Sequence, residues 1–502
     1  MKKVSGILKK ALVWKPSMKF LAVATLVMFA VMMLPLIRLA LYSVPWYDDY
    51  MYGNMPRAWM KQLNSPWGVI VGAIDCARME WYSWQGTYSS GFFMSLMPAV
   101  WGDDKYFWGP IIILTLLTVA LFVLVKVFVR DILKADWASC IVMQSITAMM
   151  VIMLIHTAQG GFYWYIGGMH YVGMHSMCLL FISCAICLLR ARRKWTTAIF
   201  LILSMLGAFV VAGANYVTAL QGMLLLLSVI ALGVCIYRKR VLLLLPALCI
   251  YAVGFYCNAA APGNANRAES FSGMGCSPIE AVLRSFAEAF LHIGEFTGFI
   301  TLAVLIVLAP VIWYIVKRSE FRFRYPLLVL VWSFCLYATG FTPSLFSMGN
   351  AGLSRTLNAV KITYQLLLIM NEVYLLGWLK GYLEEKGKLG IRDNVYWWFY
   401  PVMGAVMLLI FSVSPNKAGC YSAYGAYYYI HSGEAYNFYH EYLERVEILR
   451  SDESDVVLKP YNYKPWFLCS GDLSENPDAE PNRAIATWYG KDSVVVKAPE
   501  EQ

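Results

Sequence analysis

The chain has 502 residues, of which 59% are hydrophobic and only 14% are charged, and its net charge is +10. Soluble domains are about 45–50% apolar, so this composition excludes an ordinary soluble protein and predicts a multi-pass membrane protein. The positive charge does not indicate nucleic acid as a partner, because Lys and Arg are sorted into short segments between apolar runs and form no single basic face.

The first apolar run, residues 20–44, is long enough to cross a bilayer, which takes about 20 apolar residues. It is longer than the apolar core of a signal peptide and no small-residue cleavage site follows it, so we expect it to remain as a helix. Basic flanks stay in the cytoplasm, which places segment 1–19 inside and the stretch Trp46–Tyr50 outside. The basic residues of that segment are Lys2, Lys3, Lys9, Lys10, Lys15 and Lys19.

Ten further apolar runs bring the predicted number of spans to eleven, all within a transmembrane domain of residues 20–413. Basic clusters follow alternate runs, so every cluster falls on one side of the plasma membrane and the C-terminus falls outside. Segment 207–216 is rich in Gly and Ala, and a broken helix is the alternative interpretation there. The runs are 106–129, 138–156, 171–189, 196–213, 218–237, 241–257, 296–316, 325–340, 358–379 and 397–413.

Two external regions are long enough to fold on their own. The first loop, residues 45–105, is predicted to contain a surface helix over 66–84. Residues 414–502 are predicted to form a small α/β domain with a helix over 434–449 and strands over 455–459 and 493–497. Four Cys map outside the apolar runs, namely Cys76, Cys276, Cys420 and Cys469. A Cys420–Cys469 disulfide is our first hypothesis, although spacing alone does not fix the pairing.

The external loops carry the residues that could perform chemistry. Asp48 and Asp49 are candidate catalytic carboxylates, and the alternative is a solvated start of the loop. Glu80 and Trp84 in the first loop, with Trp164 and His170 in the second, suit the stacking and hydrogen bonding of a sugar ring. Trp and Tyr are also common in interfacial belts, so an aromatic belt is the competing interpretation.

Two Gly/Asn-rich turns end in Arg267 and Arg355, and Lys361 follows the second. Backbone N–H groups beside a guanidinium favour phosphate binding, whereas a solitary Arg could simply contact lipid headgroups. Glu288, His292 and Glu295 share one face of a predicted helix, which indicates a functional set of ionisable groups near the bilayer. They are too few to define a metal site, and no Cys or His cluster has zinc-site spacing.

These motifs, in their order, resemble GT-C type membrane glycosyltransferases, and most closely a bacterial family of multi-pass proteins of unknown function. That family carries a DDY motif, a W-x-G motif, a YW-x-x-G loop and a PGN-x-x-R turn. The matching residues are Asp48–Tyr50, Trp84–Gly86, Tyr163–Gly167 and Pro262–Arg267. The family often has Arg after W-x-G, but this chain has Thr87, so no phosphate role is transferred to that position.

The resemblance implies a GT-C-like fold and transfer of a sugar from a polyprenyl-phosphate donor to a cell-surface glycan or lipid acceptor. Asp48 or Asp49 would be the general base, while Arg267, Arg355 and Lys361 would bind the donor phosphate. The expected substrate-binding residues are Glu80, Trp84, Trp164, His170, Asn264, His292 and Glu295. Some GT-C enzymes use a divalent metal, but this sequence requires none and implies no other cofactor.

Two other functions fit the same sequence. A transporter or flippase for lipid-linked sugars would use intramembrane Arg38, Glu288 and Glu372 to line a path. An oligosaccharide polymerase or ligase would also use external Arg residues.

Overall fold

The computed structural model describes residues 17–271, 273–387, 404, 421–469 and 471–497. Eight of its helical segments are long and apolar enough to cross a membrane. The described chain is therefore a helical, multi-pass membrane protein. The segments are Met18–Ala40 (α2), Asp103–Ile132 (with α6), Tyr165–Arg190 (with α9), Lys194–Ala212 (α10), Tyr216–Ala259 (with α11 and α12), Phe299–Arg318 (α15), Pro326–Met348 (with α16 and α17) and Ser354–Glu385 (α18).

Helices occupy ten of the eleven predicted apolar runs, but the number of candidate spans is smaller. The runs 218–237 and 241–257 fall in one helical stretch, where α11 (Tyr216–Tyr237) joins α12 (Leu245–Ala259) through η6 (Arg238–Leu244). Run 138–156 becomes α7 (Trp137–Met153), whose 17 residues reach only about 26 Å, less than the thickness of a bilayer core. Run 397–413 lies, except for Gly404, outside the described residues.

The two runs predicted on either side of Asn215 belong to separate candidate spans, as the main interpretation expected, and not to one broken helix. α10 ends at Ala212, and α11 begins at Tyr216 after Asn215, whose side-chain oxygen accepts a hydrogen bond from Thr218 N at 3.0 Å. A side-chain oxygen in this N-cap position satisfies a backbone N–H that the first turn leaves free. The segment therefore reverses the chain between two helices.

The membrane helices bury one face and expose another that is equally apolar. Leu36 and Leu39 of α2 are fully buried, whereas Val23 and Leu34 are 64% and 62% exposed. Water would penalise such a surface, but hydrocarbon tails would not. This pattern supports a lipid-facing side for α2.

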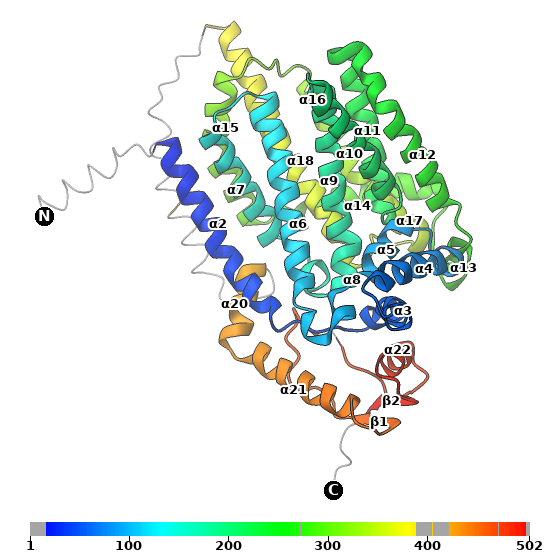
Figure 1. The fold of residues 1–502 in the computed structure, drawn as a ribbon. Helices are drawn as coiled ribbons and strands as arrows, with labels where there is room; N and C mark the ends of the chain where they lie inside the picture. Colours follow the sequence, from blue (N-terminus) through cyan, green and yellow to red (C-terminus); the bar gives the residue numbers. More distant parts are fainter. Residues whose placement is uncertain (1–16, 272, 388–403, 405–420, 470, 498–502) are drawn as a thin grey trace, which may run out of the picture.

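Short helices lie across one end of the bundle, at the bottom of Figure 1. They include α3 (Asp48–Leu63), α4 (Trp67–Ser83) and α5 (Tyr88–Ser95), with α13 (Gly263–Ser270) beside α4. The helix predicted over 66–84 is α4, and it packs against α3 and α5. The C-terminal end of α18 lies at the opposite end of the bundle (Figure 1). The remaining elements of the bundle are η1 (Pro98–Trp101), η2 (Asp103–Lys105), α6 (Trp108–Val125), η3 (Lys126–Ile132), η4 (Gln159–Tyr163), α8 (Tyr165–Gly168), η5 (Met169–Gly173), α9 (Met174–Arg190), α14 (Pro278–Phe296), α16 (Pro326–Ala338) and α17 (Thr342–Met348).

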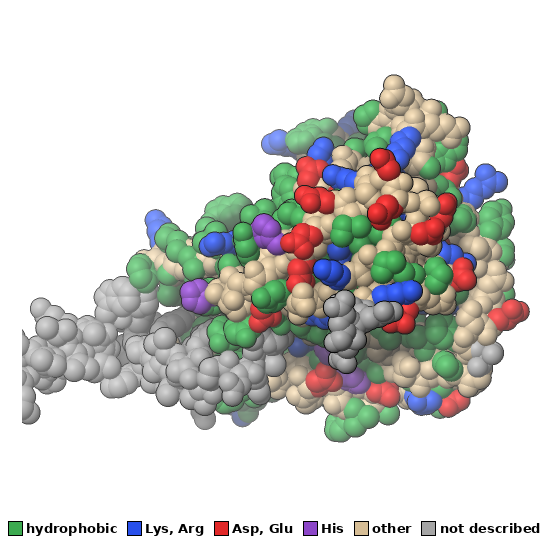
Figure 2. Space-filling view, turned by 90° about the horizontal axis from the view of Figure 1, so that it is seen from below, with side chains coloured by type: hydrophobic (Ala, Val, Ile, Leu, Met, Phe, Trp, Pro, Cys, Tyr) green, Lys and Arg blue, Asp and Glu red, His purple; other side chains and the backbone are tan. Residues whose placement is uncertain are grey.

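The described C-terminal residues, 421–497, form what we call the C-terminal cap. It contains α20 (Ser422–His431), α21 (Glu434–Leu449), β1 (Asp455–Leu458), α22 (Glu480–Tyr489) and β2 (Ser493–Val496). The two strands pair in parallel, with Asp455 opposite Ser493, and α22 lies in the crossover between them. The predicted helix and both predicted strands are thus confirmed. Figure 2, which views this end of the molecule, shows acidic and basic side chains interspersed over it.

Asp103 joins the cap to the first loop, residues 45–105. Its carboxylate accepts hydrogen bonds from Arg450 at 2.9 Å, Trp488 Nε1 at 3.1 Å and Tyr489 OH at 3.2 Å. Gly53 of α3 permits the close approach, because a Cβ there would lie 2.8 Å from the Trp488 ring. The cap therefore packs directly on α3.

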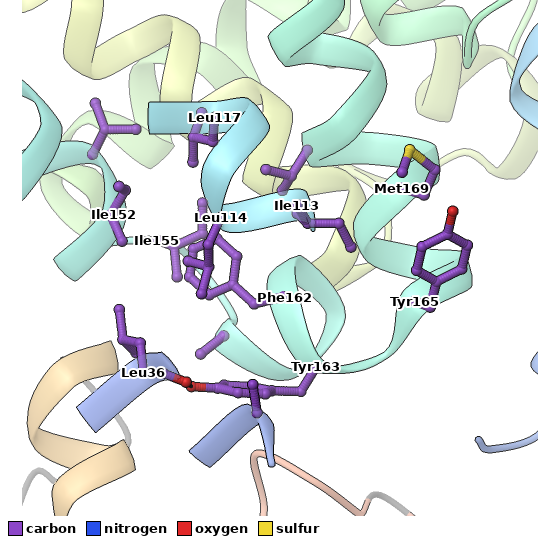
Figure 3. Close-up of a cluster of buried hydrophobic side chains, with 14 of the residues drawn as sticks. Leu36, Ile113, Leu114, Leu117, Ile152, Ile155, Phe162, Tyr163, Tyr165 and Met169 are labelled. Carbon is purple, nitrogen blue, oxygen red and sulfur yellow. Dashed lines mark hydrogen bonds between the residues drawn. The ribbon is translucent and has the colours of Figure 1, made fainter. Parts of the chain in front are cut away.

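A buried apolar layer supports the loop between α7 and α9 (Figure 3). Leu36, Leu114 and Phe162 are each no more than 1% exposed and come from α2, α6 and the loop. Tyr163 OH donates to Leu36 O at 3.2 Å and anchors the loop to the end of α2. This loop between α7 and α9, which we call the aromatic loop, is thereby held at the end of the bundle next to the start of α3.

The cysteines add no cross-link to the described part of the chain. Cys76, Cys276 and Cys469 are free thiols, and Cys420 lies outside the described residues.

Candidate functional site

The acidic pair opens α3, which begins immediately after Tyr47. Tyr47 has a φ of 51°, an unusual value for a residue other than Gly, and this turns the chain sharply into the helix. Both carboxylates then lie in the first turn, where the helix dipole favours negative charge. Successive residues of a helix point about 100° apart, so Asp48 and Asp49 face different surroundings.

Asp49 is fully buried, and both of its carboxylate oxygens are occupied. Oδ2 accepts from Trp46 N at 2.9 Å and from Tyr106 OH at 2.6 Å, and Oδ1 accepts from Ile166 N at 3.2 Å. Burial raises the pKa of Asp49 to about 7, although the three hydrogen bonds lower it. Asp49 thus ties the start of α3 to the turn before α6 and to the loop between α7 and α9, and it offers no free oxygen to a substrate.

Asp48 is partly exposed, and its carboxylate makes no hydrogen bond within the described residues. Burial raises the pKa of Asp48 to about 6. The Arg355 guanidinium lowers it, and the Glu480 and Glu80 carboxylates raise it. Those three neighbours come from α18, α22 and α4 respectively. Asp48 therefore lies where the membrane bundle, the first loop and the cap meet.

Arg355 approaches this point over an aromatic face. Its guanidinium carbon lies 5.1 Å from the centroid of Trp164, and Trp46 meets the same ring edge-on at 5.5 Å. Gly160 is needed for this packing, because a Cβ there would lie 2.9 Å from Arg355 Cβ. Trp164 Nε1 is buried without a hydrogen-bond partner among the described residues. The loop between α7 and α9 thus places the Arg355 guanidinium beside the Trp164 indole, whose N–H has no partner among the described residues.

The PGN-x-x-R turn interlocks with the W-x-G motif through Asn264. Its Oδ1 accepts from Gly86 N at 3.0 Å and from Tyr216 OH at 2.6 Å, while Nδ2 donates to Asn258 O at 2.8 Å. Only Gly fits at position 86, since a Cβ there would lie 1.8 Å from Asn258 O. The amide of Asn264, which the sequence predicted to bind substrate, is thus engaged within the protein.

Arg267 follows from this turn and reaches the first loop. It donates to Gln85 Oε1, and its guanidinium carbon lies 5.6 Å from the centroid of Trp84. Burial raises the pKa of Glu80, whereas Arg267 and the 2.9 Å hydrogen bond from Tyr52 OH lower it. Glu80 therefore lies between a cation and a phenol.

Arg267 and Arg355 both lie near His170. Arg267 and Arg355 both act electrostatically on its imidazole, whose Nδ1 is buried without a hydrogen-bond partner among the described residues. Glu480 acts on both Asp48 and Glu80. We call this set the acid–arginine cluster: Asp48, Glu80, His170, Arg267, Arg355 and Glu480.

The other predicted residues form a second cluster. His292 Nε2 and His156 Nδ1 lie 3.7 and 3.5 Å from Glu295 carboxylate oxygens, and His292 Nδ1 lies 3.6 Å from Glu288 Oε2. Lys361 Nζ lies 5.5 Å from the Phe296 ring, which packs against His156. Lys361 follows Arg355 by six residues on α18, a rise of about 9 Å, so the two clusters are neighbours. The described residues contain no group of three or more His, Cys, Asp or Glu that could hold a metal ion.

Sequence reasoning missed three residues of the site. Glu480 opens α22 and reaches Asp48 only through the packing of the cap on α3, which no local pattern reveals. Tyr106 binds Asp49, and Gln85 binds Arg267. Gln85 was at least visible as the middle residue of the W-x-G motif.

Comparisons with protein families, curated proteins and solved structures give no match to this chain. The resemblance to GT-C glycosyltransferases therefore stays a prediction from the motifs.

Proposed function

We propose that this protein is a membrane glycosyltransferase of the GT-C type. It transfers a sugar from a polyprenyl-phosphate donor to a cell-surface glycan or lipid acceptor on the extracytoplasmic face. The observation that carries the proposal is Asp48, a carboxylate without hydrogen bonds to described residues, beside Arg355 and near a group of Trp side chains. The topology that goes with it has the N-terminus in the cytoplasm and the C-terminal cap outside the plasma membrane.

In the proposed reaction, Asp48 accepts the proton of the acceptor hydroxyl. The acceptor oxygen forms a bond to the anomeric carbon, the bond from that carbon to the phosphate oxygen breaks, and polyprenyl phosphate leaves with the bonding electrons. A pKa of about 6 leaves Asp48 mostly ionised near neutral pH, as a general base requires. Arg267 and Arg355 stabilise the charge that develops on the leaving phosphate. Trp84 and Trp164 provide faces on which a sugar ring can stack.

The test is transfer by the purified full-length protein in detergent. Radiolabelled polyprenyl-phosphate hexoses and pentoses are offered with envelope glycan, with and without EDTA, and the label is followed from lipid to glycan. Transfer supports the enzyme. The same preparation in liposomes distinguishes a flippase, which would move the lipid-linked sugar across the bilayer without breaking it.

One observation favours the transporter as a second candidate. Glu372 Oε2 in α18 is buried without a hydrogen-bond partner among the described residues, as expected for a polar group lining a path. Arg38, by contrast, is exposed at the end of α2, and Glu288 pairs with His292. The polymerase or ligase alternative would be recognised by the joining of preassembled oligosaccharides.

A further inference from the structure

A cleft separate from the acid–arginine cluster lies between α3 and the C-terminal cap. Its volume is about 300 Å³, and its walls come from α3, from the end of α21 and from α22. Arg57 and Lys61 line it from α3, Arg450 and Ser451 follow α21, and Thr487 and Trp488 belong to α22. The cleft is large enough for a charged group with its attached sugar.

Three cations face this cleft, and one carboxylate partly balances them. Arg450 Nη2 lies 2.9 Å and Arg57 Nη1 lies 3.8 Å from the Asp103 carboxylate. Lys61 is exposed and makes no ion pair within the described residues. The cleft therefore keeps an excess of positive charge that would attract an anion.

Arg57 lines the cleft beside Trp488. Its guanidinium carbon lies 4.1 Å from the centroid of Trp488, while Nη1 is buried and makes no hydrogen bond to a described residue. Nη1 has the Asp103 carboxylate 3.8 Å away as its ion-pair partner, and 24% of the Arg57 side-chain surface stays exposed, where a carboxylate or phosphate oxygen of a ligand could contact it. An Arg held over an indole has its position restricted, and its guanidinium can bind a planar or tetrahedral anion through two N–H groups.

The position along α3 connects this cleft with Asp48. Arg57 follows Asp48 by nine residues on the same helix, a rise of about 14 Å. Nine residues turn a helix through about 900°, so Asp48 and Arg57 point to opposite sides of α3. The buried ring of Tyr50 meets the buried Trp488 edge-on at 5.4 Å and packs α3 against the cap. An acceptor that reaches both places must therefore be a glycan of several sugars that passes around this end of α3, with one sugar at Asp48 and a charged group at Arg57.

We propose that the cleft formed by Arg57, Lys61, Arg450 and Trp488 binds a carboxylate or phosphate group of the acceptor, which is therefore an anionic glycan. The identification of the ligand as the acceptor rests on the proposed function, but binding of an anionic glycan can be measured without sugar transfer. A lipid headgroup supplies the same phosphate chemistry, and the experiment separates the two sources.

The experiment measures equilibrium binding to the full-length protein in detergent, with hexagalacturonate as the anionic probe and maltohexaose as the neutral probe. We expect hexagalacturonate to bind and to weaken as salt is raised, and maltohexaose to bind at least tenfold more weakly. Lys61→Gln should weaken hexagalacturonate binding about tenfold. Lys61 is exposed, so this variant should fold. Arg57→Gln should weaken binding by at least as much, and Lys464→Gln, exposed outside the cleft, should match the parent.

Equal binding of the two oligosaccharides, or parental binding by both cleft variants, would overturn the proposal. Competition by phosphatidylglycerol nanodiscs would also overturn the proposal if the nanodiscs displace hexagalacturonate from the parent protein but not from the Lys61→Gln variant. The cleft would then be a binding site for lipid headgroups. Sugar transfer that shows no preference for an anionic acceptor leaves the glycosyltransferase in place and removes this inference. If hexagalacturonate binding depends on Lys61 but the protein shows no transfer activity, the cleft proposal stands and the glycosyltransferase proposal fails.

Discussion

Replacing each member of the acidic pair by Asn should produce two different defects. Asn keeps the volume of Asp but accepts no proton, and it presents an NH₂ group in place of one oxygen. At position 48 no hydrogen bond within the described residues is lost, so Asp48→Asn should fold normally. If Asp48 is the general base, turnover should fall by about 10²–10⁴ while donor binding survives.

At position 49 the same replacement would leave hydrogen-bond donors that now face the carboxylate without an acceptor. If the NH₂ group takes the place of Oδ1, Ile166 N loses its partner, and if it takes the place of Oδ2, Trp46 N and Tyr106 OH lose theirs. Each buried donor left unpaired costs about 1–3 kcal/mol. We therefore expect Asp49→Asn to lower the thermal unfolding temperature clearly, and to lower activity only through the loss of folded protein.

The assay pairs thermal unfolding of purified, monodisperse variants with turnover of a polyprenyl-phosphate sugar per folded molecule. Asp48→Ala serves as a control for the side chain, because it removes the base without adding a donor. The reasoning is refuted if Asp49→Asn is as stable as the parent, or if Asp48→Asn retains parental turnover. The second result would leave the glycosyltransferase without its catalytic group and would favour the transporter.

Arg267→Ala and Arg355→Ala should each lower kcat/KM by a factor that corresponds to about 1.5–3 kcal/mol, and Lys at either position should restore part of the loss. The exposed Arg78→Ala should have no effect, and parental kinetics in both the Arg267→Ala and Arg355→Ala variants would mean that the donor phosphate binds elsewhere. Turnover should rise with pH through about 6 as Asp48 loses its proton, and Arg355→Ala should move this inflection to higher pH because Arg355 lowers the pKa of Asp48; an unmoved inflection would assign it to another group. If a reporter that works only in the cytoplasm is active when it is fused after residue 497, the proposed topology is refuted.

Local pattern predicted the helices and the cap strands well. The amphipathic spacing that indicated a helix over 434–449 corresponds to α21, and the β-branched runs at 455 and 493 are β1 and β2. These elements follow from residue periodicity and chain length, which act over a few residues. The pairing of the two strands joins segments far apart in the chain and was outside the reach of such a pattern.

The site was predictable only in part, for the same reason. Short motifs pointed to Asp48, Arg267 and Arg355, but their proximity depends on packing between distant helices. The different roles of Asp48 and Asp49 depend on the direction each takes from α3, which the hydrogen bonds of Asp49 with Tyr106 and Ile166 show. Glu480 was invisible because its neighbours lie on helices of the first loop and its sequence context is an ordinary helix start.

The contact of α22 with α3 has a consequence for how the protein is made. In the proposed topology, α22 follows every described membrane helix along the chain, so it crosses to the outer face only after they have been inserted. Until then Tyr50 and Asp103 lack the partners Trp488, Tyr489 and Arg450, and Asp48 lacks Glu480. If the proposed function holds, a nascent chain would thus have the arginines proposed to bind the donor but an incomplete acceptor surface, and biosynthesis itself would delay the onset of activity until translocation is finished.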